Sequence, residues 1–151
     1  MKIYEICFSP TGGTRKAADI LAGELSTEIQ NIDLTDSTAD FNNISLTQND
    51  ISVIAVPSYG GRVPEPAAKR ISAIHGNGSR AILMCVYGNR AYEDTLAELQ
   101  DVAKQAGFRV ISAVAAIAEH SSARQFAAGR PDAQDLTAAD RWILSRANRL
   151  I

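Results

Sequence analysis

The sequence is poor in the residues that build metal centres and disulfide frameworks. Its 151 residues include two cysteines and two histidines, and no CxxC pair is present. Two cysteines without that spacing exclude a cysteine-rich zinc or iron–sulfur site within this chain. Cys7 and Cys85 each lie in an apolar run, so we expect two small buried side chains without a disulfide and assign no metal ligand.

Several motifs and segments that would define a function class are also missing. The GxxxxGK[ST] phosphate loop and the GxGxxG dinucleotide motif are absent. No Ser/His/Asp triad or pair of catalytic carboxylates is apparent, so no catalytic residue is assigned. Apolar runs stay short of a membrane span, and no signal-peptide pattern is seen. With a net charge of −2, we predict a cytoplasmic protein that binds neither nucleic acid nor membranes.

The chain does contain apolar strand-like runs that alternate with helical patterns. With 46% hydrophobic residues, a chain of this length fits a single domain, 1–151. The alternation predicts an α/β fold, a doubly wound five-stranded parallel sheet of order 2-1-3-4-5 with helices on both faces. We expect strands at 2–8, 28–34, 51–57, 80–87 and 108–118, and helices at 14–25, 66–74, 92–106 and 137–150, with an irregular stretch at 119–134.

The first strand and helix are joined by a short loop rich in hydroxyls and glycine. Unpaired N–H groups at a helix start attract anions, and glycine lets the main chain approach one closely. Hydroxyls add further donors. The loop therefore predicts a site for a phosphate monoester, with an ordinary glycine-rich turn capped by Thr14 as the alternative. Its candidate residues are Ser9, Thr11, Gly12, Gly13 and Thr14.

Three segments in order carry a resemblance to a known family. Residues 9–14, 57–64 and 87–94 resemble the flavodoxin-like FMN-binding family, and they are most similar to the flavodoxin domain of flavodoxin–ferredoxin fusion proteins. The resemblance covers nearly the whole chain and implies FMN as the cofactor. In the fusion family an iron–sulfur domain follows, whereas this chain stops at Ile151 without the cysteines of such a domain.

The second and third segments leave the carboxyl ends of strands, where ligands bind in such sheets. In the second, Ser58, Tyr59, Gly60 and Gly61 are candidates: the Tyr59 ring would stack on the flavin, and the glycines would let a peptide carbonyl turn toward flavin N5. The alternative for Tyr59 is simple loop packing. In the third, backbone amides and the Asn89 side chain would hold the pyrimidine edge, and Tyr87 or Tyr92 would cover a ring face. The alternatives are a core position for Tyr87 and a plain turn for Asn89. Its candidates are Tyr87, Gly88, Asn89 and Tyr92.

Three functions remain open from the sequence. The first is an FMN-binding electron-transfer protein that serves a redox partner protein, for example an iron–sulfur protein or domain. The second is an NAD(P)H-dependent FMN or quinone reductase that uses the same flavin. Its nicotinamide pocket would need cationic groups, for which the candidates are Arg62, Arg90, His120 and Arg124. The third is a flavodoxin-like binding module that has lost its cofactor.

Overall fold

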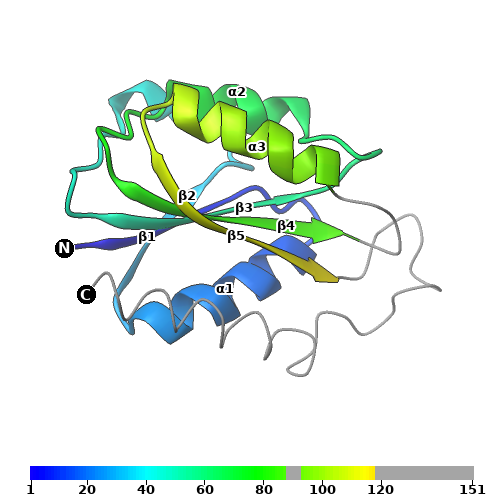
Figure 1. Cartoon of the computed structure of the whole chain (residues 1–151), viewed down its shortest axis with the longest axis horizontal. Helices are drawn as coiled ribbons and strands as arrows, with labels where there is room; N and C mark the ends of the chain where they lie inside the picture. Colours follow the sequence, from blue (N-terminus) through cyan, green and yellow to red (C-terminus); the bar gives the residue numbers. More distant parts are fainter. Residues whose placement is uncertain (88–92, 118–151) are drawn as a thin grey trace.

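The computed structural model describes residues 1–87 and 93–117, which form a five-stranded, all-parallel sheet with helices on both faces (Figure 1). The strand order is β2-β1-β3-β4-β5, so the predicted fold class and order are confirmed. The elements are β1 Ile3–Cys7, α1 Gly13–Leu25, β2 Ile29–Asp33, the 3₁₀ turn η1 Phe41–Asn43, β3 Ile51–Pro57, α2 Glu65–Ala73, β4 Arg80–Tyr87, α3 Glu93–Gln105 and β5 Arg109–Ile117.

The sheet separates two apolar cores. Helix α1 covers one face, and α2 and α3 cover the other (Figure 1). Every residue of β3 is buried, as expected of a central strand covered on both sides. Strand β2 lies at the sheet edge, as the predicted strand order requires, and Ile32 is its one buried residue. The two cysteines are buried and free, as predicted.

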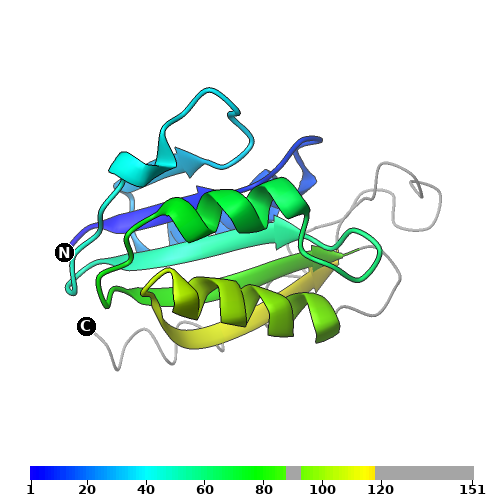
Figure 2. The same cartoon turned by 90° about the horizontal axis from the view of Figure 1, so that it is seen from above.

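The strand register brings three carboxyl ends together. Cys7 at the end of β1 pairs with Ala55 of β3, and Pro57 at the end of β3 pairs with Val86 of β4. Figure 2 shows the neighbouring strands running in the same direction beneath α2 and α3. The loops after β1 and β3 therefore emerge side by side, at the position where the strand order reverses.

The structure corrects three predicted helix ends. Thr14 is not the N-cap of α1: Gly12 is, with a left-handed backbone (φ +93°) and no side-chain cap. Helix α2 begins at Glu65, one residue before Pro66, which takes the second helical position instead of the first. At its other end α2 stops at Ala73, one residue before the predicted end at residue 74, and Ile74 is its cap.

Helix α3 ends at Gln105, one residue before the predicted end at residue 106, and Gly107 terminates it. The φ of Gly107 is +93°, its amide donates to the Lys104 carbonyl, and the Phe108 amide donates to the Ala103 carbonyl. This pair of bonds is the Schellman arrangement, in which glycine supplies the left-handed residue.

Part of the prediction lies outside the described residues. This holds for the irregular stretch 119–134 and for the helix at 137–150, and the single domain over 1–151 also stays a prediction. Within residues 1–87 and 93–117, no helix is long and apolar enough to cross a membrane.

Candidate functional site

The loop after β1 is held at its base by its neighbouring strands. The Phe8 amide donates to the Ala55 carbonyl of β3 at 3.0 Å. The Ser9 amide donates to the Thr35 hydroxyl oxygen at 2.8 Å, beyond the end of β2. The loop thus starts from a fixed point between β2 and β3, directly before α1.

Only some of the backbone N–H groups at the start of α1 donate hydrogen bonds within the described residues. Two of its first amides are used: Arg15 N–H donates to Ser9 Oγ at 2.9 Å, and Lys16 N–H donates to the Gly12 carbonyl at 3.0 Å. The amides before them have no hydrogen-bond partner among the residues that the structure describes. They belong to Thr11, Gly12, Gly13 and Thr14. Consecutive unpaired N–H groups at the positive end of a helix dipole form an anion site.

The loop's shape suits close approach by a ligand. Gly12 is exposed with φ +93°, and a Cβ built there meets nothing within 4 Å, so the space beside it is open. Thr11 is exposed, Gly13 is half-buried and Thr14 is buried. The residues present therefore fit a phosphate group held mainly by backbone amides, and the Thr11 hydroxyl is open to it.

Arg15, the cationic side chain that directly follows this loop, pairs with carboxyl groups of the sheet. Arg15 Nη1 donates to Glu5 Oε1 at 2.7 Å, and its Nη2 lies 3.6 Å from Asp33. Glu5 is only 1% exposed. Burial, together with the neighbouring Asp19 carboxyl, raises its pKa to about 7 despite Arg15. The Arg15 guanidinium is thus committed to a buried carboxyl beneath α1.

The loop after β3 is a closed two-residue turn. The Tyr59 amide donates to the Arg62 carbonyl at 2.9 Å, and the Arg62 amide donates to the Tyr59 carbonyl at 3.0 Å. Gly60 and Gly61 between them have φ values of +60° and +78°. Positive φ at both central positions is characteristic of a type I′ turn and explains the Gly-Gly pair. Such a turn presents Tyr59 at a defined place.

Tyr59 is 39% exposed, among the few large hydrophobic residues exposed in the described part of the chain. The part of its ring that is covered raises the pKa of its hydroxyl. Ser58 is buried, and its amide donates to the Val86 carbonyl at 3.0 Å, which joins this loop to the end of β4. Of the residues predicted for this loop, the structure brings Tyr59 and both glycines to the surface and uses Ser58 as an internal anchor.

Of the candidates in the third predicted segment, only the first, Tyr87, lies among the described residues. Tyr87 ends β4 and is half-buried. Gly88, Asn89 and Tyr92 lie outside the described residues, as do three of the four cations considered for a nicotinamide pocket, Arg90, His120 and Arg124.

The fourth of those cations, Arg62, has a structural partner. Its Nη2 lies 2.6 Å from Glu98 Oε2, on α3. Neither Glu98 nor the Glu5–Arg15 pair was singled out from the sequence, because the partners lie 36 and 10 residues apart in the chain.

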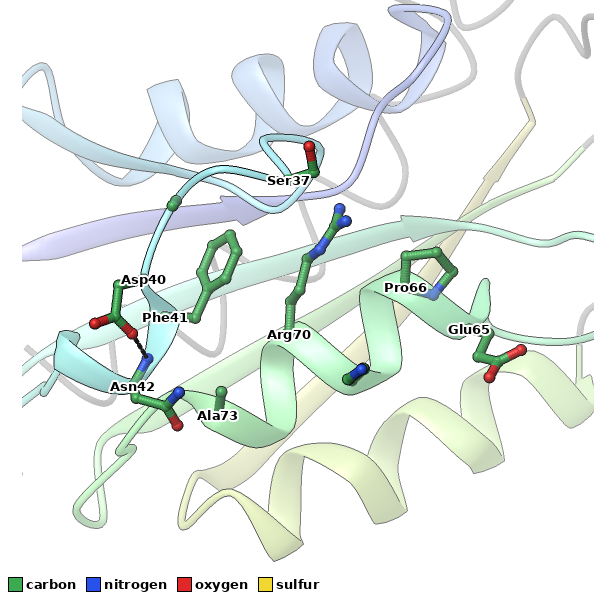
Figure 3. Close-up of a pocket in the computed structure, with 10 residues that line it drawn as sticks. Ser37, Asp40, Phe41, Asn42, Glu65, Pro66, Arg70 and Ala73 are labelled. Carbon is green, nitrogen blue, oxygen red and sulfur yellow. Dashed lines mark hydrogen bonds between the residues drawn. The ribbon is translucent and has the colours of Figure 1, made fainter.

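A cavity of about 530 Å³ lies elsewhere, between α2 and residues 37–42 (Figure 3). Lys69 and Arg70 of α2 line it, and Arg70 also donates to the Leu34 carbonyl at 2.6 Å. On the opposite wall the Asp40 carboxylate accepts the Asn42 amide at 3.1 Å. None of the predicted cofactor residues lines this cavity.

The described residues offer no alternative metal or thiol chemistry. Among residues 1–87 and 93–117, no group of three or more His, Cys, Asp or Glu side chains could hold a metal ion. Burial raises the pKa of both cysteine thiols to about 12, which makes them poor nucleophiles.

Comparisons with known proteins agree with the architecture. No family model matches the chain, and no curated protein sequence matches it either. Among solved structures, a flavodoxin from the domain Archaea aligns with a TM-score of 0.64 at 15% identity, covering 99% of both chains. Flavodoxin 1 from Bacillus cereus aligns at 0.62 and 18% identity, covering 94% of each. A flavoprotein in complex with FMN from Lactobacillus acidophilus aligns at 0.57 and 11% identity, covering 94% of this chain and 98% of that one. The chain therefore has the flavodoxin-like fold.

Proposed function

We propose that this protein binds FMN and transfers electrons between redox partners. The observation that carries the proposal is the row of four amides from Thr11 to Thr14 at the start of α1, which have no hydrogen-bond partner among the described residues. They lie beside the closed turn that presents Tyr59. A phosphate and an aromatic ring are the two ends of FMN that these features suit. The FMN complex of the Lactobacillus acidophilus flavoprotein, which has a similar fold, supports the choice of cofactor.

Each part of the site has a distinct task in this proposal. The amides of residues 11–14 would bind the phosphate, Tyr59 would cover one face of the ring system, and the Gly60–Gly61 peptide would hydrogen-bond to a ring nitrogen. Bound FMN supplies the electron-transfer chemistry, while the protein sets its potential through stacking, hydrogen bonds and nearby charge. Residues 88–92 would contact the pyrimidine edge.

The carrier role is preferred to the reductase role because of Arg62. A nicotinamide pocket would need cations open to the nucleotide, and the Arg62 guanidinium forms two hydrogen bonds to Glu98 Oε2 and one to Oε1. A redox partner protein, for example one that carries an iron–sulfur cluster, would exchange electrons at the exposed ring edge. We also propose that the protein is cytoplasmic and that it is related to flavodoxin–ferredoxin fusion proteins.

The visible absorption spectrum tests the proposal. We expect the purified protein to retain a flavin band after incubation with FMN and washing, and the band to bleach with dithionite. A folded protein that retains no flavin would contradict FMN binding and favour a module without cofactor. Steady turnover of NADPH with a quinone, in place of fast exchange with an iron–sulfur protein, would favour the reductase.

A further inference from the structure

The turn after β3 is held at both ends by one face of α3. Thr95 and Glu98 are three residues apart on this helix and therefore project from the same side. Thr95 Oγ1 and Ser58 Oγ lie 2.7 Å apart in a buried hydrogen bond before the turn. Glu98 reaches Arg62 and Val63 after the turn. We call Thr95 and Glu98, with these contacts, the α3 clamp.

Glu98 contacts both a side chain and a backbone amide at the end of the turn. Its Oε1 accepts the Val63 amide at 2.7 Å, and its Oε2 accepts Arg62 Nη2 at 2.6 Å. The Arg62 bonds lower the pKa of Glu98, with the Val63 amide contributing in the same direction. An exposed ion pair contributes little to stability by itself, and Arg62 is 70% exposed. Val63 is itself buried, and the hydrogen bond that its amide donates to Glu98 is the part that fixes where the turn ends.

The geometry of the turn leaves one peptide free to reorient. Type I′ and type II′ turns share a positive φ at the first central residue and differ at the second, so the peptide between the central residues can rotate from one form to the other. Gly61 at the second position tolerates both signs of φ. The paired bonds between Tyr59 and Arg62 close both turn forms, so rotation of this peptide need not displace Tyr59.

We propose that Glu98 is a positioning residue for the flavin site: by holding Arg62 and Val63, it confines movement of this loop to the Gly60–Gly61 peptide. This inference rests on the proposed FMN function. Helix α3 also follows directly on residues 88–92, so the helix that carries the third predicted loop fixes the position of the second. Arg62 then serves the α3 clamp and not a nicotinamide pocket.

The test compares Glu98→Ala, Glu98→Gln and Arg62→Gln with Asp101→Ala as the control. Asp101 is exposed on the same helix, and its side chain has no hydrogen bond or ion pair among the described residues, so its removal reproduces the change of charge alone. The measurements are the Kd for oxidised FMN, the midpoint potential of the bound flavin, and hydrogen exchange of the Val63 amide without FMN.

Glu98→Ala should weaken FMN binding about tenfold, or about 1.4 kcal/mol. Binding of one-electron-reduced FMN should weaken about threefold more than binding of oxidised FMN, because the rotated peptide then lacks a fixed position. At 59 mV per tenfold for one electron, this threefold ratio lowers the midpoint potential of the bound flavin by about 28 mV. Glu98→Gln and Arg62→Gln keep an acceptor for Val63 and should stay within about threefold of the wild-type Kd. Val63 exchange should rise only in Glu98→Ala.

The outcomes separate this inference from the function on which it rests. A wild type that binds no FMN contradicts the proposed function, and the flavin role of Glu98 falls with it. A wild type that binds FMN, with Glu98→Ala at the wild-type Kd and potential and only a lower melting temperature, overturns the positioning role alone. Equal changes of the FMN Kd and the potential in Glu98→Ala and Asp101→Ala would also overturn it, since the loss of one negative charge would then explain the whole effect.

Discussion

Replacing Gly12 by alanine should damage the protein in two ways that can be measured separately. Gly12 has φ +93°, and a Cβ at this position meets no atom within 4 Å. The cost in the absence of ligand is therefore purely that of the backbone, about 1–2 kcal/mol for an L-residue in the left-handed region. The added methyl group also lies beside the unpaired amides, where it would obstruct the phosphate.

Gly23 provides the matched control on the same helix. It lies within α1, is exposed, has no positive φ, and a Cβ there also meets nothing within 4 Å. Gly23→Ala should therefore stabilise the protein by about 0.5–1 kcal/mol, because alanine loses less backbone entropy in a helix. The same chemical change should thus have opposite signs at the two positions.

Thermal unfolding without FMN measures the first effect, at roughly 2–4 °C per kcal/mol for a protein of this size. Gly12→Ala should melt below the wild type and Gly23→Ala above it. A titration with FMN measures the second effect, and only Gly12→Ala should bind more weakly. Equal melting temperatures for the two variants, or wild-type FMN affinity in Gly12→Ala, would refute the assigned role of Gly12.

Variants at three further positions test other parts of the structure. Because the pKa of Glu5 is raised from 4.5 to about 7, its contribution to stability is fully present below pH 4.5 and is lost as the pH rises through 7. The free energy of unfolding of Glu5→Gln, measured with urea, should therefore rise by up to about 3 kcal/mol relative to that of the wild type between pH 4.5 and pH 8. Parallel pH profiles for the two proteins would contradict a buried acid at position 5. Tyr59→Ala should weaken FMN binding by about 1 kcal/mol or more, and Tyr59→Phe much less; unchanged affinity in Tyr59→Ala would show that the ring does not stack. Gly76→Ala places a Cβ 2.7 Å from the Phe108 backbone nitrogen, so it should cost about 1–3 kcal/mol in chemical unfolding, and wild-type stability would disprove this close approach.

The features that the sequence predicts best are local ones. The continuous apolar run of β3 and the Gly-Gly pair after it each specify their structure within a few residues, the second because two positive φ values in a row favour glycine. Thr14 shows the limit of this argument. A hydroxyl before a helical pattern usually marks an N-cap, but the left-handed Gly12 starts the helix earlier and leaves Thr14 buried inside it.

The features that the sequence does not reveal are contacts between distant residues. Glu5 sits in a strand pattern that gives no hint of burial, and its partner Arg15 reaches it only because α1 folds back over β1. Glu98 lies 36 residues from Arg62, on a helix whose pattern distinguishes an apolar face but not a partner for a loop. Neither pair follows from composition or spacing, since each depends on how helix and sheet pack.

The most direct test of the account is a comparison of FMN with riboflavin, which has the same ring system but no phosphate. Fluorescence quenching on titration with the protein gives both dissociation constants under the same conditions. If the amides of residues 11–14 bind the phosphate, with two or more charge-assisted hydrogen bonds, FMN should bind at least about 100-fold more tightly than riboflavin. Equal affinity for the two flavins would contradict the phosphate site at the start of α1.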